Sequence, residues 1–283
     1  MAKLIYVGQN GNTIDLFSNK WFQLVNVDGL THTSSNISSS TNPNIDGDKV
    51  NLIQTQPRSI ILDLMVKPDV NVEDAKRDIL RTVKPKQRGK LRMVYKGRSL
   101  EIDSVVESIN MPRFNNSVTM QIGLYCSQPY WMDIENVLVE IARVIDWHYF
   151  PTDEGGLSFP SEGIPFGVYD LKMTRSCTND GDADCGMVIT IIAVANVVNP
   201  TIYKADGSFI GVNDTMEAGD EIIINTNRGE KAITKNGVNI LSKIKKGSTF
   251  LQLDVGVNEL TIDSDDETEG NVYFVLTFKR RFV

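Results

Sequence analysis

Turn residues divide the chain into short apolar runs at nearly regular intervals, and this spacing restricts it to folds built from strands. In the second half, six runs rich in β-branched or aromatic residues follow one another at roughly ten-residue spacing, with no second strong helical pattern. They span residues 187–198, 221–225, 231–234, 249–253, 259–262 and 272–278. Turn pairs such as Asn199-Pro200 and Asn236-Gly237 separate them. The second half is therefore predicted to be an antiparallel β-sandwich.

The first half also favours strands. Short apolar runs bounded by turn residues fill the first thirty residues, and RSIILDLMV (58–66) is a further strand. Residues 91–109 predict a hairpin that turns at Lys96-Gly97-Arg98. Residues 117–126 alternate between apolar and polar side chains, as a half-buried strand does. This half is predicted to be a β-barrel or a β-sandwich.

One segment of the first half predicts a helix. Asn71 is a good N-cap, and Glu73 and Asp74 lie in the first turn, where the positive end of the helix dipole favours acidic side chains. The positions that share one face are apolar, namely Val72, Ala75, Ile79, Leu80 and Val83. Pro85 ends the helix. The predicted fold class is mainly β, with one α-helix in the N-terminal domain.

Residues 31–44, THTSSNISSSTNPN, are almost entirely Ser, Thr and Asn. Such a segment has too little apolar surface to be buried in a core. We expect either a long exposed arm whose order depends on a partner, or a merely mobile loop.

The length of the chain predicts two domains, because 283 residues exceed the size at which one core usually stops growing. Pro129, Tyr130 and Trp131 directly follow the alternating strand, and we expect the two rings to anchor the chain at the junction between the domains. The Gly- and Pro-rich stretch that follows is typical of a connector. The predicted division is 1–134, a connector at 135–167, and 168–283.

The charge of the chain is negative but uneven. A net charge of −7 and a pI near 5.0 argue against a dedicated binder of nucleic acid or of anionic membranes. Ten basic residues and one acid nevertheless lie between Lys76 and Arg98. This run is either an ordinary solvated surface or a set of contacts between copies of the chain. The candidate contact residues are Lys76, Arg77, Arg81, Lys84 and Arg88.

The usual signatures of catalysis and of nucleotide binding are missing from the sequence. His32 and His148 are too far apart for HExxH, and there is no GxSxG, no GxxxxGK[ST] and no GxGxxG after a strand. A Cys–His pair is disfavoured because the sequence around Cys177 and Cys185 is acidic. Paired carboxylates for glycoside hydrolysis stay open, because their separation depends on the fold. We assign no catalytic and no cofactor-binding residue.

No metal site and no membrane insertion are expected. Asp180, Asp182 and Asp184 have the alternate spacing of a calcium loop, but Cys185 and Ile191 occupy the sixth and twelfth positions of an EF-hand counted from Asp180. An odd number of cysteines without CxxC disfavours both a disulfide framework and a zinc site, and fits synthesis in a cytoplasm. The apolar part of the longest suitable stretch is shorter than a membrane helix.

The order of these elements resembles a known family. The strand RSIILDLMV, the helix AKRDILRTVKP, the hairpin LRMVYKGRSLEIDSVVESI and a last strand closing on CSQPYWMD are similar to the N-terminal domain of siphophage distal tail proteins. The segments GDEIIINTNRGEKAITKNGVNIL, GSTFLQLDVGVNELTI and YFVLTFKRRF resemble the C-terminal galectin-like sandwich of that family. Gly256 and Asn258 belong to a turn that recurs in it.

This resemblance implies a structural virion protein, made in the host cytoplasm, and no enzyme. Six copies would form a hexameric ring at the distal end of a long non-contractile phage tail. The ring, made by the N-terminal hub domains, would connect the tail tube protein to the tail-associated protein and to receptor-binding proteins of the tip or baseplate. DNA would pass through the ring without specific binding, so we expect the basic run at protein contacts and away from the channel.

The main alternative is a carbohydrate-binding module that takes part in host-surface adhesion. A galectin-like sandwich can hold a glycan on a sheet by stacking an aromatic ring and by hydrogen bonding to hydroxyls. It needs an exposed Trp or Tyr in the second domain, and no Trp follows Trp147. An enzyme such as a tail hydrolase is the third possibility.

Overall fold

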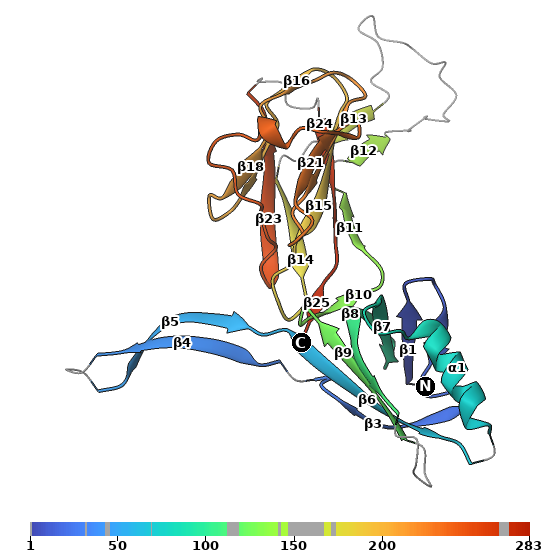
Figure 1. The fold of residues 1–283 in the computed structure, drawn as a ribbon. Coiled ribbons are helices and arrows are strands. Elements are labelled where there is room, and N and C mark those ends of the chain that lie inside the picture. The colour runs from blue at the N-terminus through green and yellow to red at the C-terminus, as the bar shows by residue number, and fades with distance from the viewer. Residues whose placement is uncertain are drawn as a thin grey trace, which may run out of the picture. The chain divides into compact units, whose positions relative to one another are not determined.

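A computed structural model divides the chain into two compact units (Figure 1). Unit 1 comprises Met1–Ile134 and Arg281–Val283, and unit 2 comprises Glu135–Arg280. The residues that the structure describes are 2–31, 33–42, 46–68, 70–111, 119–140, 143–146, 167–170, 174–265 and 272–283. Unit 2 is thus inserted into the chain of unit 1.

Unit 1 is built on a nine-stranded antiparallel sheet. Its strands are β1 (Lys3–Gly8), β2 (Thr13–Asp15), β3 (Phe22–Asp28), β6 (Arg58–Val66), β7 (Arg88–Tyr95), β8 (Arg98–Asn110), β9 (Thr119–Cys126), β10 (Trp131–Asp133) and β25 (Arg281–Phe282). Seven of them follow the order β2-β1-β7-β8-β9-β6-β3, and β10 pairs with β8 and β25. The residues that follow unit 2 in the chain therefore complete the sheet of unit 1.

Alternation along the strands buries one face of this sheet. In β6, Ile60, Leu62 and Leu64 are at most 1% exposed, whereas Ser59, on the other face of the strand, is exposed. Burying such a side chain stabilises the fold by about 1.5–3 kcal/mol. A shift of one residue would turn the whole apolar set outward, so the burial pattern also fixes the register.

The hairpin predicted at residues 91–109 is formed by β7 and β8. Its two-residue turn, Lys96-Gly97, has positive φ angles of 48° and 81°. Two positive φ angles are the signature of a turn whose twist matches that of the flanking strands. Tyr95 pairs with Arg98 across the turn.

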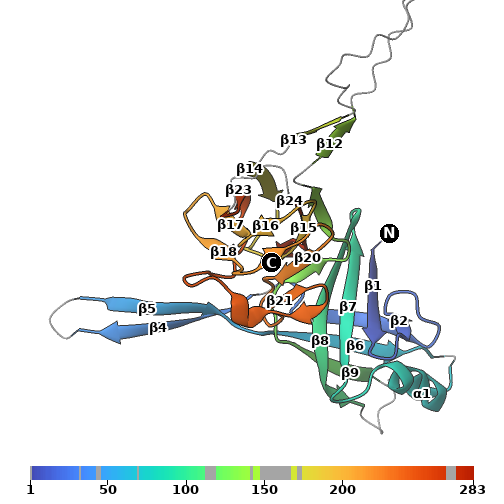
Figure 2. The same cartoon turned by 90° about the horizontal axis from the view of Figure 1, so that it is seen from above.

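The predicted helix is α1 (Val72–Thr82). The Asn71 side chain accepts a hydrogen bond from the Glu73 N–H at 2.9 Å, as expected of an N-cap. Ala75 and Ile79 are buried. In Figure 2 the helix lies at the end of the unit 1 sheet that is away from the N-terminus. The prediction of a mainly β fold with one α-helix in the N-terminal domain is confirmed.

Two further strands of unit 1, β4 (Ser35–Thr41) and β5 (Asp48–Thr55), pair only with each other. This ribbon, here called the arm, projects from the chain between β3 and β6 (Figure 1). A long exposed loop or an extended arm was expected at residues 31–44, and Ser35–Thr41 form one strand of an extended arm; that its order depends on a partner stays a prediction. Its second strand was not predicted.

Unit 2 contains two main antiparallel sheets. The six-stranded sheet runs in the order β11 (Val137–Glu140), β24 (Val272–Phe278), β15 (Met187–Ala193), β20 (Glu221–Asn225), β21 (Ala232–Lys235) and β22 (Val238–Asn239). The four-stranded sheet consists of β14 (Thr174–Asn179), β23 (Gly256–Asp263), β17 (Thr201–Lys204) and β18 (Phe209–Gly211). Smaller elements are β12 (Arg143–Asp146) with β13 (Gly167–Asp170), β16 (Val197–Val198) with β19 (Thr215–Met216), and the 3₁₀ helix η1 (Leu241–Lys243).

One core joins the two sheets of unit 2, with Ile191 from β15, Phe274 from β24 and Leu260 from β23 all fully buried. The apolar strand β24 is paired on both sides, with β11 and β15, as expected of an edge that would otherwise aggregate. The prediction of a strand at residues 249–253 is wrong. Backbone N–H groups there donate to carbonyls in separate segments, so no continuous ladder forms.

The observed division of the chain differs from the predicted one in two places. Within the predicted connector, Val137 and Val139 belong to β11 and pack against the core of unit 2. At the other end, Phe282 pairs with Trp131 in unit 1 and does not belong to the second sandwich. Strand pairing depends on backbone hydrogen bonds between segments far apart in sequence, which composition does not reveal. No helix among the described residues is long and apolar enough to cross a membrane.

The turn that leads into β23 is fixed by one buried side chain. Asn258, 3% exposed, accepts a hydrogen bond from the Asp254 N–H at 2.9 Å and donates to the carbonyls of Asp254 and Gly256 at 2.8 and 3.1 Å. Gly256 has a φ of 99°, which disfavours any side chain. The turn at Gly256 and Asn258 that the sequence indicated is thus held by hydrogen bonds from a side chain to the backbone.

Replacing Asn258 with Ala should lower the free energy of unfolding of unit 2 by about 1–3 kcal/mol, because three partly buried hydrogen bonds to the backbone are lost. Urea titration of the full chain followed by hydrogen exchange in β23 measures this. Asn239→Ala is the matched control, since Asn239 is exposed and bonds only to the Leu241 N–H. Equal losses for the two variants would contradict the prediction.

Asp220 holds the turn before β20. Its carboxylate accepts hydrogen bonds from the Asn236 side chain at 2.8 Å, the Glu217 N–H at 2.9 Å and the Lys235 ammonium at 2.9 Å. These bonds, that of Asn236 foremost, favour the charged form and lower the pKa of Asp220 to about 2. The ionised carboxylate therefore stabilises the folded state.

Unit 2 should lose stability in acid through Asp220. An unfolded Asp has a pKa of about 3.9, so the stabilisation is fully present above that pH and is lost as the pH falls towards about 2. The midpoint of urea unfolding at β20, measured by hydrogen exchange across this window, should fall less steeply in Asp220→Asn than in the wild type. Identical pH profiles would count against it.

Candidate assembly interface

The arm presents an apolar face to solvent. Ile37 pairs with Ile53, and Val50 lies opposite Ser39 on the same face, because a register shift adds Asn51 to β5. Ile37, Val50 and Ile53 are 59%, 52% and 64% exposed. A two-stranded ribbon without a further layer is marginally stable in water. The apolar face of the arm is therefore suited to being covered.

The opposite face of the arm is mostly polar. Ser40 donates a hydrogen bond to the Asn51 side chain at 3.4 Å across the ribbon. The residues on this face are Asn36, Ser38, Ser40, Lys49, Leu52 and Gln54. The two faces of the arm thus differ in the surface that each can contact.

The root of the arm is fixed at one carbonyl oxygen, that of Leu30. It accepts hydrogen bonds from the Arg58 guanidinium and from the Trp131 indole N–H, the latter at 3.1 Å. Leu30 precedes the arm and Arg58 follows it, so these bonds join the two chain ends of the arm. Gly29 has a φ of 82°, and a Cβ there would lie 2.0 Å from the Ser59 carbonyl oxygen. The chain passes too close to β6 for any side chain at this position.

The predicted junction anchors Pro129, Tyr130 and Trp131 lie beside this root. The Tyr130 hydroxyl is 3.3 Å from the Thr55 hydroxyl at the end of the arm. The Arg281 guanidinium lies 5.9 Å from the centroid of the Tyr130 ring. The two rings thus connect the arm with β10 and β25. Anchoring of the domain junction by these residues stays a prediction.

Arg58 is a buried charge that its surroundings compensate only in part. It is 3% exposed, and its Nε and Nη2 have no hydrogen-bond partner among the described residues. Burial lowers the pKa of Arg58. The residue opposite it in β9 is Cys126, and burial raises the pKa of that thiol to about 12. The thiol therefore stays neutral and does not balance the guanidinium.

The predicted contact residues lie on α1 and on the turn that follows it. Arg77, Arg81, Lys84 and Arg88 are exposed, and Lys76 is half-buried. None of the five takes part in the ion pairs found within the described ranges. Their role in contacts stays a prediction.

Further along the same basic run, two cations serve the stability of unit 1 itself. The Lys90 ammonium lies 2.8 Å from one oxygen of Glu101, and Arg92 Nε lies 3.3 Å from the other. The Glu101 side chain is only 3% exposed, and Asp103 adds a contact to Lys90 at 3.6 Å. These charges raise the pKa of Lys90 against the opposing effect of burial. The run therefore divides into paired cations on β7 and unpaired cations on α1 and its following turn.

The acidic loop considered for calcium is used for ion pairs. Asp180 accepts two hydrogen bonds from Arg280, at 2.9 and 3.0 Å, and Asp184 accepts one from Arg228 at 2.6 Å. In the part of the chain that the structure describes, no three metal-ligating side chains come together.

The remaining candidates for chemistry are dispersed. Cys126, Cys177 and Cys185 are buried and form no disulfide, and burial raises the pKa of Cys177. His32 and His148 lie outside the described residues. The rings of Tyr203 and Phe209 pair with each other at 5.6 Å and an angle of 38°. Glycan binding stays a prediction of the sequence.

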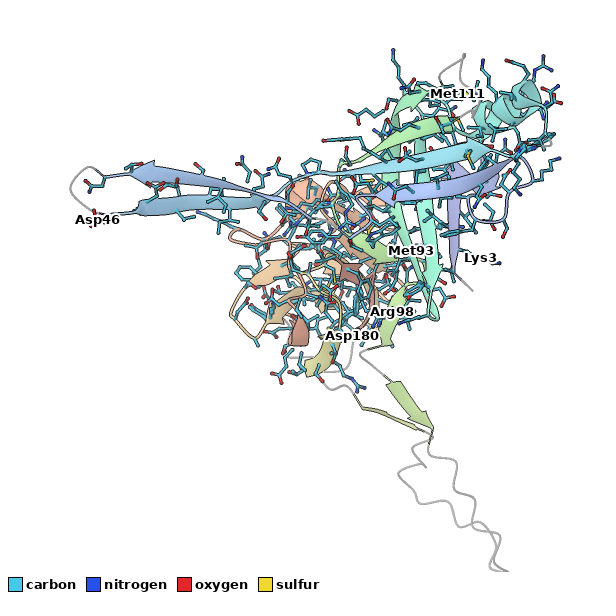
Figure 3. The ribbon with its side chains drawn as sticks, turned by 90° about the horizontal axis from the view of Figure 1, so that it is seen from below. Lys3, Asp46, Met93, Arg98, Met111 and Asp180 are labelled. Atoms are coloured by element: carbon cyan, nitrogen blue, oxygen red, sulfur yellow. The ribbon has the colours of Figure 1, made fainter. Side chains whose placement is uncertain are left out.

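Sequence reasoning missed the second strand of the arm. The signal was the segment DKVNLIQT (48–55), which follows the turn residues Asp46-Gly47. It pairs in antiparallel fashion with SNISSST (35–41), which precedes that turn. Figure 3 shows Asp46 at the tip of the arm. A hairpin in which neither strand enters a core lacks the apolar alternation on which strand prediction depends.

The fold and the arm define a class of protein, a strand-built chain of two compact units in which a two-stranded arm projects from the first. Residues 180–282 match the model of the family described as siphovirus-type tail component, C-terminal domain, of SPP1 Dit type. The whole fold is similar to the crystal structure of Dit (gp 19.1) of phage SPP1, a hub of the adsorption apparatus of phages that infect Gram-positive bacteria. The identity is 15%, both chains are covered fully (100%), and the TM-score is 0.67.

Structures of the phage p2 baseplate in its activated conformation are also similar. The form with Sr has 14% identity and a TM-score of 0.51, the form with Ca has 12% and 0.50, and coverage is 100% of both chains in each case. Comparison of the sequence with curated proteins gives no significant match. Residues 180–282 thus resemble the C-terminal domain of siphovirus-type tail components, and the chain has the fold of a Dit hub protein. The resemblance drawn from the sequence motifs is confirmed.

Replacing Trp131 with Phe should loosen the root of the arm. Loss of the indole N–H removes one of the two hydrogen bonds to the Leu30 oxygen, which costs about 1 kcal/mol. Hydrogen exchange of the full chain should be faster at the root of the arm. Trp21→Phe is the matched control, because the buried indole N–H of Trp21 has no partner among the described residues. Equal effects in both variants would refute the role of Leu30.

Proposed function

We propose that this chain is a structural virion protein at the distal end of a long non-contractile phage tail. Six copies form a ring that connects the tail tube to the tail-associated and receptor-binding proteins of the tip or baseplate. The protein is made in the host cytoplasm and acts by geometry, without chemistry of its own. The match of residues 180–282 to a tail component family and the Dit fold of the whole chain support this role.

The arm is the observation that carries the ring. Three of its four exposed aliphatic side chains, Ile37, Val50 and Ile53, lie on one face of a ribbon that no third strand of the described residues covers. Burying them against a neighbouring copy stabilises each contact by about 3–5 kcal/mol. A projecting arm on one copy and its acceptor surface on the next make a heterologous contact, which closes into a ring when the rotation allows.

The channel of the ring must let DNA slide, so its wall should offer no firm phosphate contacts. The solvent face of β3, β6, β9 and β8 suits this purpose. Asn26, Asp63, Gln121 and Asn110 form one row across the four strands, and Asp63 accepts hydrogen bonds from Gln121 at 3.0 Å and Asn26 at 3.5 Å. A shallow hollow of about 320 Å³ beside this row has no Lys or Arg in its lining. This face lines the channel in the proposed ring.

The ring is tested by the mass of the full chain in solution. Six copies of the 31.6 kDa chain have a mass of about 190 kDa, measurable by light scattering after size exclusion, with the tail tube protein added if assembly requires it. Ile37→Thr, Val50→Thr and Ile53→Thr together keep β-branched side chains but remove the apolar face. This triple variant should run as a monomer.

The matched control for the arm carries three changes on the opposite face, Asn36→Thr, Ser38→Thr and Ser40→Thr. It should assemble as the wild type does. A ring that survives the loss of the apolar face would refute the role of the arm. A wild-type chain that stays monomeric even with its tail partners would refute the ring.

A further inference from the structure

We propose that α1 and the turn at residues 84–88 form a docking surface for an acidic end face of the tail tube protein. This cationic surface consists of Lys76, Arg77, Arg81, Lys84, Lys86 and Arg88. The proposal rests on the proposed function and adds which end of unit 1 meets the tube. It is independent of the arm, because it concerns a different part of the sheet.

The cationic surface and the root of the arm lie at opposite ends of the sheet of unit 1. β6 begins at Arg58 beside the root and ends at Val66, eight residues later, before α1. At about 3.3 Å per residue the two ends are more than about 25 Å apart. Figure 3 shows the same polarity in β8, with Arg98 at one end and Met111 at the other, beside α1. A contact made by the arm root therefore leaves the cationic surface available for another partner.

The cations of this surface are not neutralised within the structure. Several basic side chains elsewhere in the described part of the chain are paired with acids, as in Lys90 with Glu101, Lys235 with Asp220 and Arg280 with Asp180. No such pair involves any of the six residues of the cationic surface. Unit 1 as a whole has 17 Lys and Arg against 13 Asp and Glu, although the chain has a net charge of −7. Unpaired cations concentrated in one place favour an anionic partner.

The cationic surface is held on rigid supports. Arg77 and Arg81 lie one turn apart on α1, so the helix holds the two side chains near each other although like charges at this spacing repel. In the following turn, the Lys86 N–H donates to the Val106 carbonyl at 3.0 Å, and the Gln87 carbonyl accepts from the Val106 N–H at 3.0 Å. These bonds fasten the turn to β8. Docking on such a surface orders little backbone, so more of the contact energy remains as affinity.

The chemistry of this surface fits an acidic protein better than DNA. Glu73 and Asp74 are exposed and Asp78 half-buried on the same helix, and none of the three belongs to an ion pair within the described ranges. Free carboxylates among the cations repel a phosphate backbone but match the mixed charges of a protein. Two copies of this chain placed face to face would bring cations against cations. An acidic partner that is not this surface of a second copy therefore fits best.

The experiment measures binding of the full chain to the purified tail tube protein encoded with it. The triple variant Arg77→Glu, Arg81→Glu and Arg88→Glu should lower the association rate constant at least about tenfold, because exposed interface charges act mainly on association. The wild-type rate should fall as salt rises from about 50 to 300 mM, and the rate of the variant should change much less. Self-assembly, measured by light scattering, should be the same for both.

The matched control is Lys3→Glu, Lys96→Glu and Lys246→Glu, which changes the net charge equally at exposed sites outside the cationic surface. It should bind the tube protein as the wild type does. Equal loss in both variants, or no loss in the first, overturns the proposal. The proposal is also overturned if the wild type binds a DNA duplex of about 30 base pairs, or three helical turns, and only the first variant loses this binding. A missing ring at unchanged tube binding would count against the proposed function and not against this surface.

Discussion

The Leu30 carbonyl oxygen is the point on which the arrangement of unit 1 depends. One side chain from β6 and one from β10 donate to it, and the strand that holds Trp131 also pairs with residues 281 and 282. The start of the arm, the start of β6 and β10 are thereby joined at one atom, and β10 in turn pairs with the segment that follows unit 2. Because that oxygen is shared by three segments, the direction in which the arm leaves the sheet is set by the whole unit and not by the arm.

Arg58 shows that this joint is not optimised for the stability of the isolated chain. A buried guanidinium with two unpartnered nitrogens costs free energy that an apolar side chain of the same size would not. What it provides is direction, since its fixed geometry aligns β6 with the Leu30 carbonyl. Specificity of geometry at the expense of stability suits the proposed ring, in which the arm meets a surface on another copy.

Several elements followed from local sequence. Helix α1 was predicted from an N-cap, two first-turn acids and an apolar stripe, all of which act within a few residues. The β7–β8 hairpin and strands β20 and β24 were predicted in the same way, because their alternation and turn residues reflect local backbone preferences. The stretch 249–253 has a similar composition, but Thr249 bonds to Phe209 and Leu253 forms an isolated bridge with Cys185, so its local preference was overridden.

The candidate interface was predicted only in part. The basic residues on α1 were identified from charge density, but the sequence did not separate them from Lys90 and Arg92. These two cations on β7 form ion pairs with the buried Glu101 on β8, the other strand of the hairpin. Tyr130 and Trp131 were predicted to anchor the domain junction, and this stays a prediction; the partners that they have in the structure, Thr55 and Leu30, lie 75 and 101 residues earlier in the chain. The second strand of the arm was missed because it has no buried partner.

The sequence by itself determined the strand-rich class, the single helix, the uneven charge and the family resemblance. These properties follow from composition, periodicity and short motifs, and each can be recognised within about twenty residues. Only the tertiary structure decided that residues 281–283 complete unit 1, that β11 belongs to unit 2 and that the arm has one apolar face. Each of these depends on which distant backbone groups pair and in which register, and a one-residue shift such as that in β5 reverses the outcome.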